Sequence, residues 1–130
     1  MNFEIKKLEK HTDPRGWLVE FLKQSETTEK IQQIYIASLE PGTIRGNHYH
    51  QKRIEWFFVI GNDVRIHLQD IKTKETKIID IRPDNPSRIS IFPSTAHAVV
   101  NKGKNVAHLI SAQNNIYDPG DPDTFEYELL

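Results

Sequence analysis

Cysteine is absent from this chain of 130 residues, which excludes disulfide bonds and thiolate metal ligands. This composition fits a cytoplasmic protein, although many secreted proteins also lack cysteine. An excess of one charge is missing as well, because 17 basic residues stand against 18 acidic ones. The sequence therefore gives no sign of a broad electrostatic attraction to nucleic acid or to an anionic membrane surface.

Long apolar runs are also missing, and none approaches the roughly 20 residues that a membrane helix needs. Residues 1–7 lack the apolar centre of a secretory signal. No internal repeat or low-complexity segment interrupts the chain. We therefore expect a single domain spanning residues 1–130, located in the cytoplasm, that binds neither nucleic acid nor membranes.

Short strands account for most of the apolar pattern. Alternating or β-branched runs separated by Pro, Gly, Asn and Asp turns predict strands at residues 34–39, 55–60, 64–69, 77–81, 88–92, 98–101 and 106–110. Only residues 25–32 suggest a helix, and a short one. The sequence thus predicts an all-β sandwich, jelly roll or closed barrel, whose mouth can hold one small ligand.

The segment from Gly42 to Glu55 carries the clearest chemical signal. Because side chains alternate along a strand, His48 and His50 point to the same face. Glu55 opens the next strand in phase with Phe57, so it should face the same interior. Farther along the chain, His97 is a fourth candidate for this cluster.

Imidazole and carboxylate groups are the usual protein ligands of divalent transition metals. Three histidines and one glutamate would leave one or two coordination positions open, as in metal sites that act on a substrate. The alternative is that His48, His50, Glu55 and His97 are polar pocket residues hydrogen-bonded to one another. We expect a metal site, with zinc as the first choice and iron, manganese or nickel as alternatives.

These residues resemble the two motifs of the cupin superfamily. Gly42, His48, His50 and Glu55 match the first motif, while Gly61 arrives one residue early. In the second motif, Pro93, His97 and Asn101 match, but the loop is one residue short and Thr95 stands near the expected glycine. The resemblance implies a cupin-type antiparallel jelly-roll barrel with at most one short helix.

A narrower resemblance covers nearly the whole chain. The stretch from Arg45 to His50, the early residues 13–20 and the later residues 117–124 are similar to the C-terminal cupin domain of bifunctional capsular-polysaccharide enzymes. That domain epimerises a UDP-4-keto-6-deoxy-N-acetylhexosamine at carbon 3. Residues 13–20 are shared more loosely with dTDP-4-dehydrorhamnose 3,5-epimerases and dTDP-4-keto-6-deoxyhexose 3,4-ketoisomerases.

The resemblance implies an isomerase of nucleotide-linked 4-keto sugars that removes a proton next to the carbonyl. In such an enzyme His48 would be the base, and if His48 binds metal, a metal-bound water or His50 would take that role. Arg45 would contact the diphosphate or a sugar oxygen, although it could equally be a surface arginine. The family also implies a homodimer. Two alternatives stay open, a metal-dependent cupin oxygenase and a sugar-binding module without turnover.

Overall fold

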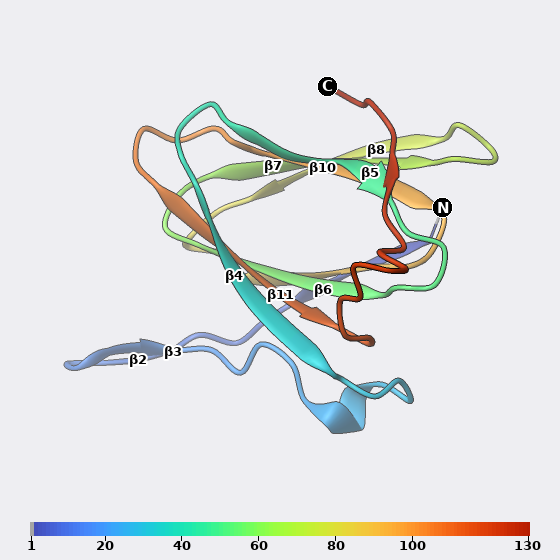
Figure 1. Ribbon diagram of the computed structural model, residues 1–130. Coiled ribbons are helices and arrows are strands. Elements are labelled where there is room, and N and C mark those ends of the chain that lie inside the picture. Colours follow the sequence, from blue (N-terminus) through green and yellow to red (C-terminus); the bar gives the residue numbers. More distant parts are fainter. Residues whose placement is uncertain (1) are drawn as a thin grey trace.

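Two five-stranded antiparallel sheets face each other in the computed structural model, which describes residues 2–130 (Figure 1). The first, here called the β6 sheet, has the strand order β1-β9-β6-β11-β4, and the second, the β10 sheet, has the order β12-β5-β10-β7-β8. The strands are β1 (Phe3–Lys7), β2 (His11–Asp13), β3 (Gly16–Leu18), β4 (Gln33–Leu39), β5 (Ile44–Tyr49), β6 (Glu55–Ile60), β7 (Val64–Asp70), β8 (Thr76–Ile81), β9 (Ser87–Ile91), β10 (Thr95–Asn101), β11 (Ala107–Gln113) and β12 (Phe125–Glu126). This architecture confirms the predicted antiparallel jelly roll. Within residues 2–130, no helix has the length and apolar character that crossing a bilayer requires.

The hydrophobic core lies between the two sheets and follows the predicted alternation. Phe57 and Val59 of β6 meet Ile66 and Leu68 of β7 and Val99 of β10 in one buried cluster. Each predicted strand exists, with bounds that shift by up to three residues at either end. The phase predicted for Glu55 and His97 is correct, because both lie on the same faces as these core residues.

The outer face of β6 is also buried, although the β10 sheet lies on the opposite side of β6. Trp56 and Phe58 are 4% and 5% exposed. The segment between β3 and β4 covers them with Phe21 and Ile31, and the Phe21 and Phe58 rings stack with centroids 5.8 Å apart. This intramolecular cover explains why β6 is apolar on both faces.

The helix predicted for residues 25–32 is wrong. The structure has only a 3-10 turn, η1 (Gln24–Glu26), and an irregular chain after it. Local side chains take the backbone donors that a helix would need: Thr27 Oγ1 accepts from the Glu29 N–H and Gln24 Oε1 from the Ile31 N–H. Such side-chain bonds compete with helix formation.

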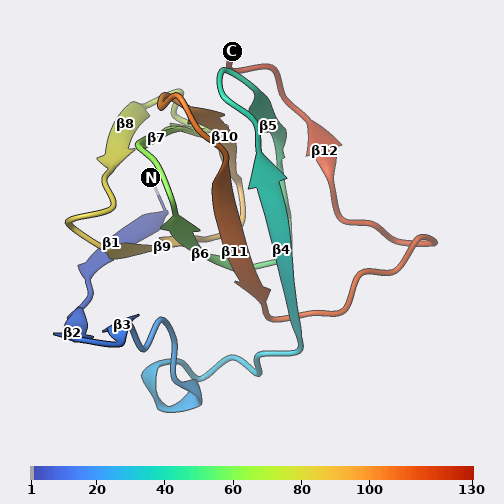
Figure 2. The same cartoon turned by 90° about the vertical axis from the view of Figure 1, so that its left-hand side faces the viewer.

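The segment after β11 forms a tail that returns along the edge of the β10 sheet (Figure 2). Its short strand β12 pairs with β5 and places Glu126 opposite His48. Asn47 then holds the end of the chain, because its side-chain oxygen accepts the Leu129 and Leu130 N–H groups at 2.9 and 3.2 Å. The sequence pattern predicted none of this tail's contacts.

Candidate metal centre and cavity

The four predicted ligand residues come together between the two sheets. His48 is on β5, His50 follows it, Glu55 begins β6 and His97 is on β10. One ligand atom from each of these residues lies within 4.8 Å of the other three. Two ligands at about 2.1 Å from one ion lie at most about 4.2 Å apart, so a small inward movement would let all four bind it.

Glu55 is the anchor of this cluster and is only 2% exposed. Its Oε1 lies 2.5 Å from His50 Nε2 and 3.8 Å from His97 Nε2. Its Oε2 points the other way and accepts hydrogen bonds from the Ser111 and Tyr35 hydroxyls at 2.9 and 3.4 Å. Burial alone would raise the pKa of Glu55, but the His50 hydrogen bond and the charges of His97 and His50 outweigh it and hold the pKa well below its usual range.

The two buried histidines are oriented by backbone oxygens. Nδ1 of His50 donates to the Asp123 carbonyl at 2.6 Å, which leaves Nε2 facing Glu55. Nδ1 of His97 lies 3.4 Å from the Thr95 carbonyl, and its Nε2 likewise faces Glu55. Second partners of this kind usually fix the ring orientation of metal-binding histidines.

His48 is the most accessible member of the cluster. Burial, together with the neighbouring His97 and His50, lowers its pKa to about 4, so its imidazole is neutral at pH 7. A neutral imidazole can either bind a metal or accept a proton. Its ring centroid is 4.7 Å from that of His97 and 5.0 Å from that of His50.

A β-bulge brings Arg45 and His48 to the same side of β5. Residues three apart on a regular strand face opposite sides, but Asn47 (φ 56°) is an extra residue where β5 pairs with β10. Gly46 precedes it with φ +102°, and a Cβ there would lie 2.6 Å from the His97 carbonyl oxygen. Glycine is therefore required at this position both by its φ and by the close approach of β10.

A cavity of about 490 Å³ opens beside the cluster between β4 and β5. It is lined by Tyr35, Arg45, His48, His97 and apolar residues such as Phe57 and Leu109. Arg45 reaches across toward β4, where its Nε donates to the Ser38 carbonyl at 3.0 Å. His50 does not line this cavity, and both of its ring nitrogens are engaged by Glu55 and Asp123.

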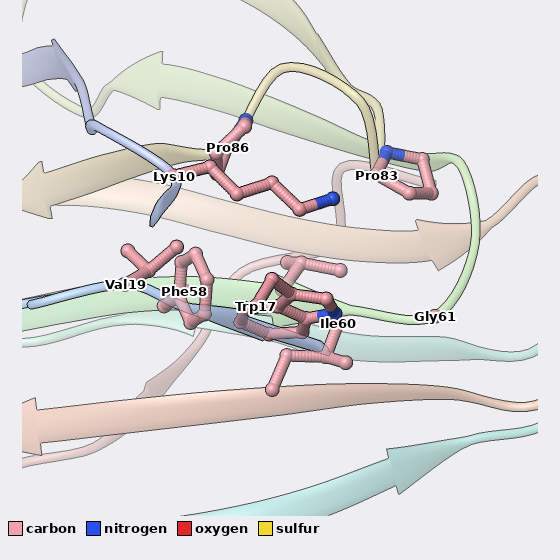
Figure 3. A pocket seen from close by; sticks show the side chains of 9 residues that line it. Lys10, Trp17, Val19, Phe58, Ile60, Gly61, Pro83 and Pro86 are labelled. Atoms are coloured by element: carbon pink, nitrogen blue, oxygen red, sulfur yellow. The ribbon is translucent and has the colours of Figure 1, made fainter. Parts of the chain in front are cut away.

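A second hollow of about 230 Å³ lies elsewhere, on the outer side of β6 (Figure 3). Trp17, Phe58, Pro83 and Pro86 give it apolar walls, and Lys10 stands over the Trp17 ring at 5.4 Å. Lys10 is its one titratable lining residue. This hollow therefore lacks the cluster of metal-ligating side chains that stands beside the histidine cavity.

Sequence comparison finds related proteins along nearly the whole chain. Residues 11–125 match the polysaccharide biosynthesis C-terminal domain family. The spore coat polysaccharide biosynthesis protein SpsL of Bacillus subtilis is 33% identical over 92% of this chain and 83% of its own length. The UDP-2-acetamido-2,6-beta-L-arabino-hexul-4-ose reductase of Pseudomonas aeruginosa is 30% identical over 88% of this chain, but this chain spans only 30% of it.

Structure comparison agrees with this grouping. The capsular polysaccharide assembling protein CapF of Staphylococcus aureus superposes on 94% of this chain with a TM-score of 0.74 and 27% identity, and 34% of CapF is covered. The dTDP-6-deoxy-D-glucose-3,5-epimerase RmlC of Legionella pneumophila, solved with dTDP-4-keto-L-rhamnose, gives a TM-score of 0.85 at 18% identity, over 98% of this chain and 73% of RmlC. The second likeness concerns the fold alone.

Proposed function

Since this chain belongs to the polysaccharide biosynthesis C-terminal domain family, we propose that it is a metal-binding isomerase of nucleotide-linked 4-keto sugars. The UDP-sugar named for the reductase relative and the dTDP-sugar bound to RmlC both carry a ketone at carbon 4. The observation that carries the proposal is the cavity beside His48, Glu55 and His97, which joins a metal-ligand set to a space for a small molecule.

The chemistry follows from the acidity of a carbon next to a carbonyl. A base removes the proton, the electron pair moves onto the carbonyl oxygen, and return of a proton to carbon from the other face inverts the centre. The enolate needs positive charge or hydrogen-bond donors near its oxygen. Arg45, His48 and Tyr35 are the cavity residues that can supply these functions.

We assign metal binding to His48, His50, Glu55 and His97. Three imidazole nitrogens and one carboxylate oxygen suit zinc first, and iron, manganese or nickel as alternatives. A bound divalent ion would polarise the carbonyl oxygen of the substrate as a Lewis acid. The assignment is supported by the buried residues His50, Glu55 and His97, whose Nε2 and Oε1 atoms already face one another, so that metal binding would require little rearrangement.

The base is assigned to His48 because, unlike His50, it lines the cavity. Its neutral imidazole can act either as the fourth metal ligand or as the proton acceptor. The substitution His48→Gln distinguishes these two roles. Arg45 is assigned to the substrate diphosphate or a sugar oxygen. Its position at the cavity wall and its permanent charge support this role.

We also propose that the protein is a cytoplasmic homodimer. Ile34 and Ile36 are 61% and 68% exposed on β4, which is an edge strand, and Trp17 and Leu18 are 47% and 58% exposed on the β2–β3 hairpin. A second copy could cover these apolar side chains and the open edge. A charged diphosphate does not cross a bilayer unaided, so the protein would act where the substrate is made.

The proposal is tested by solvent exchange. Purified protein loaded with zinc is incubated in deuterium oxide with a panel of UDP- and dTDP-linked 4-keto-6-deoxy sugars, followed by mass spectrometry and proton NMR. We expect deuterium at a carbon next to the carbonyl. Lack of exchange across the panel, with zinc bound, would contradict an isomerase. Sugar affinity without exchange would then support a binding module, and oxygen uptake by iron-loaded protein would support an oxygenase.

A further inference from the structure

A chain of four hydrogen bonds runs from the start of the tail to the metal-facing carboxylate. The Tyr117 N–H donates to Gln33 Oε1 at 2.8 Å, and Gln33 Nε2 donates to Gln113 Oε1 at 2.7 Å. Gln113 Nε2 then donates to Ser111 Oγ at 3.1 Å, and the Ser111 hydroxyl donates to Glu55 Oε2 at 2.9 Å. The strands enforce this order, because Gln113 lies opposite Gln33 on β4 and opposite Glu55 on β6.

The backbone N–H of Tyr117, where this series of hydrogen bonds begins, fixes the donor and acceptor of every bond that follows. A backbone N–H can only donate, so the atom of Gln33 that faces Tyr117 must be its oxygen. The Gln33 amide nitrogen therefore faces Gln113, whose oxygen must receive it. The Gln113 amide nitrogen is then left for Ser111. The hydrogen-bond partners therefore determine which atom of each side-chain amide, in Gln33 and Gln113, is the nitrogen and which is the oxygen.

This direction determines where the Ser111 proton goes. A hydroxyl has one proton to donate. Since Ser111 must accept from Gln113, its proton is directed to Glu55 Oε2. Ser111 and Gln113 are both 0% exposed, so bulk water offers neither of them an alternative partner, and the Glu55 carboxylate is a stronger acceptor for the Ser111 proton than the neighbouring Tyr35 hydroxyl.

Resting on the metal assignment of the proposed function, we propose that Gln33 and Gln113 are positioning residues that make Glu55 a one-oxygen metal ligand. Oε2 is engaged by Ser111, with Tyr35 as a second donor, while Oε1 faces His50 and His97. One-oxygen ligation keeps the coordination number low and preserves the open position that a substrate oxygen needs. This series of hydrogen bonds begins at the backbone N–H of Tyr117 in the tail, so a change in the position of the tail is transmitted to Glu55.

The substitution Gln33→Glu tests the direction without touching the buried members. A carboxylate at position 33 only accepts, so the Gln113 amide must turn its nitrogen toward it and present its oxygen to Ser111. Ser111 then donates to Gln113 and leaves Glu55 Oε2. Gln33 is partly exposed, so the added charge is tolerable there. The matched control is Gln32→Glu, which changes the charge equally but lies outside the chain, since the Gln32 amide donates to the Asn114 carbonyl.

Cobalt(II) is the probe, because its visible absorption weakens as its coordination number rises. We expect Gln33→Glu to give a weaker cobalt band and a roughly 10- to 100-fold higher cobalt dissociation constant than wild type, measured by competition with a chromophoric chelator. Gln32→Glu should match wild type. Ser111→Ala is the second variant and should reproduce the spectrum of Gln33→Glu.

Three outcomes distinguish the hypotheses. Wild-type protein that binds no cobalt or zinc overturns the metal assignment of the proposed function. Cobalt binding by wild type with an unchanged spectrum and affinity in Gln33→Glu overturns the positioning chain but leaves that function standing. If Gln33→Glu fails to fold, Ser111→Ala decides, and a wild-type spectrum in that variant likewise overturns the inference.

Discussion

The carbonyl oxygen of Asp123 accepts a hydrogen bond from Nδ1 of His50 at 2.6 Å, across 73 residues of sequence. The carboxylate of the same residue accepts three backbone N–H groups, from Gln51, Lys52 and Arg53, each at 2.9 Å. Burial would raise the pKa of Asp123, but these three donors lower it. One tail residue thus fixes both the loop after β5 and the imidazole of a proposed metal ligand.

Replacing Asp123 by Ala should loosen this loop. Three N–H groups lose a charged acceptor, so we expect the free energy of unfolding to fall by about 2–4 kcal/mol. The zinc dissociation constant should rise roughly 10- to 100-fold, as for other losses of support around a metal ligand. Urea denaturation and chelator competition measure the two effects. Asp121→Ala is the control, because its carboxylate is exposed and lies 3.7 Å from an exposed Lys52. Equal behaviour of the two variants would show that the Asp123 contacts are dispensable.

Gly46→Ala should damage the site from within β5. The new methyl group would meet the His97 carbonyl oxygen at 2.6 Å, and φ +102° is unfavourable for alanine. We expect a loss of about 2–4 kcal/mol in unfolding free energy and displacement of β5 from β10. Gly42→Ala is the matched control, since Gly42 also has positive φ (+77°) but nothing within 4 Å of the added carbon. If Gly46→Ala and Gly42→Ala lower the free energy of unfolding by the same small amount, the close approach of the His97 carbonyl to position 46 does not destabilise the variant.

His48→Gln separates the two duties of His48. If His48 is the base, the variant keeps bound zinc but loses deuterium exchange by roughly 100-fold or more. If His48 is a ligand, zinc affinity falls together with exchange. Elemental analysis and the exchange assay are run on the same preparation, with His108→Gln as control because His108 is on an exposed position of β11. Full exchange in His48→Gln would remove this residue from the mechanism.

Glu26 lies far from the cavity, and its ionisation should make the free energy of unfolding depend on pH. Lys6 Nζ donates to its Oε2 at 2.6 Å and Arg88 Nη1 to its Oε1 at 3.1 Å. The Lys6 hydrogen bond is the largest cause that lowers its pKa, from 4.5 to about 2. Because the folded pKa is the lower one, this stabilisation is complete above about pH 4.5 and is lost as pH falls through about 2.

Glu26→Gln should therefore be less stable than wild type at pH 7, by about 1–3 kcal/mol, since buried Arg88 loses its carboxylate. The difference in urea midpoint between the two proteins should shrink as pH falls from 5 to 2. Glu4→Gln, an exposed carboxylate on β1, serves as control. A difference that stays constant over this pH range would show that Glu26 is not the group responsible.

The fold and the grouping of the four candidate ligand residues could be predicted because both depend on local rules. Alternation along β6 placed Glu55 with Phe57 and Val59, and the same rule placed His97 with Val99 and Asn101. Spacing then indicated that His48 and His50 belong with them, and the four residues do lie together.

The remaining parts of the site depend on contacts between distant segments, which periodicity does not encode. Nothing local indicates that Asp123 reaches His50, or that Gln33, Gln113 and Ser111 form one chain. The bulge at Asn47 also breaks the alternation, so the shared orientation of Arg45 and His48 could not be derived by counting. Residues 25–32 do not form the predicted helix because the side chains of Gln24 and Thr27 accept hydrogen bonds from backbone N–H groups that a helix would use.

The docking of the tail also makes the orientation of His50 depend on a long-range contact. The contact between His50 and Asp123 spans 73 residues, so the chain must close a long loop before this contact can form. Until β12 pairs with β5, His50 lacks the carbonyl that orients its ring. An ion that reached the chain at that stage would meet a flexible pair of imidazoles. The orientation of the four candidate ligands is therefore a property of the finished fold, and we expect metal affinity to appear only once the tail has docked.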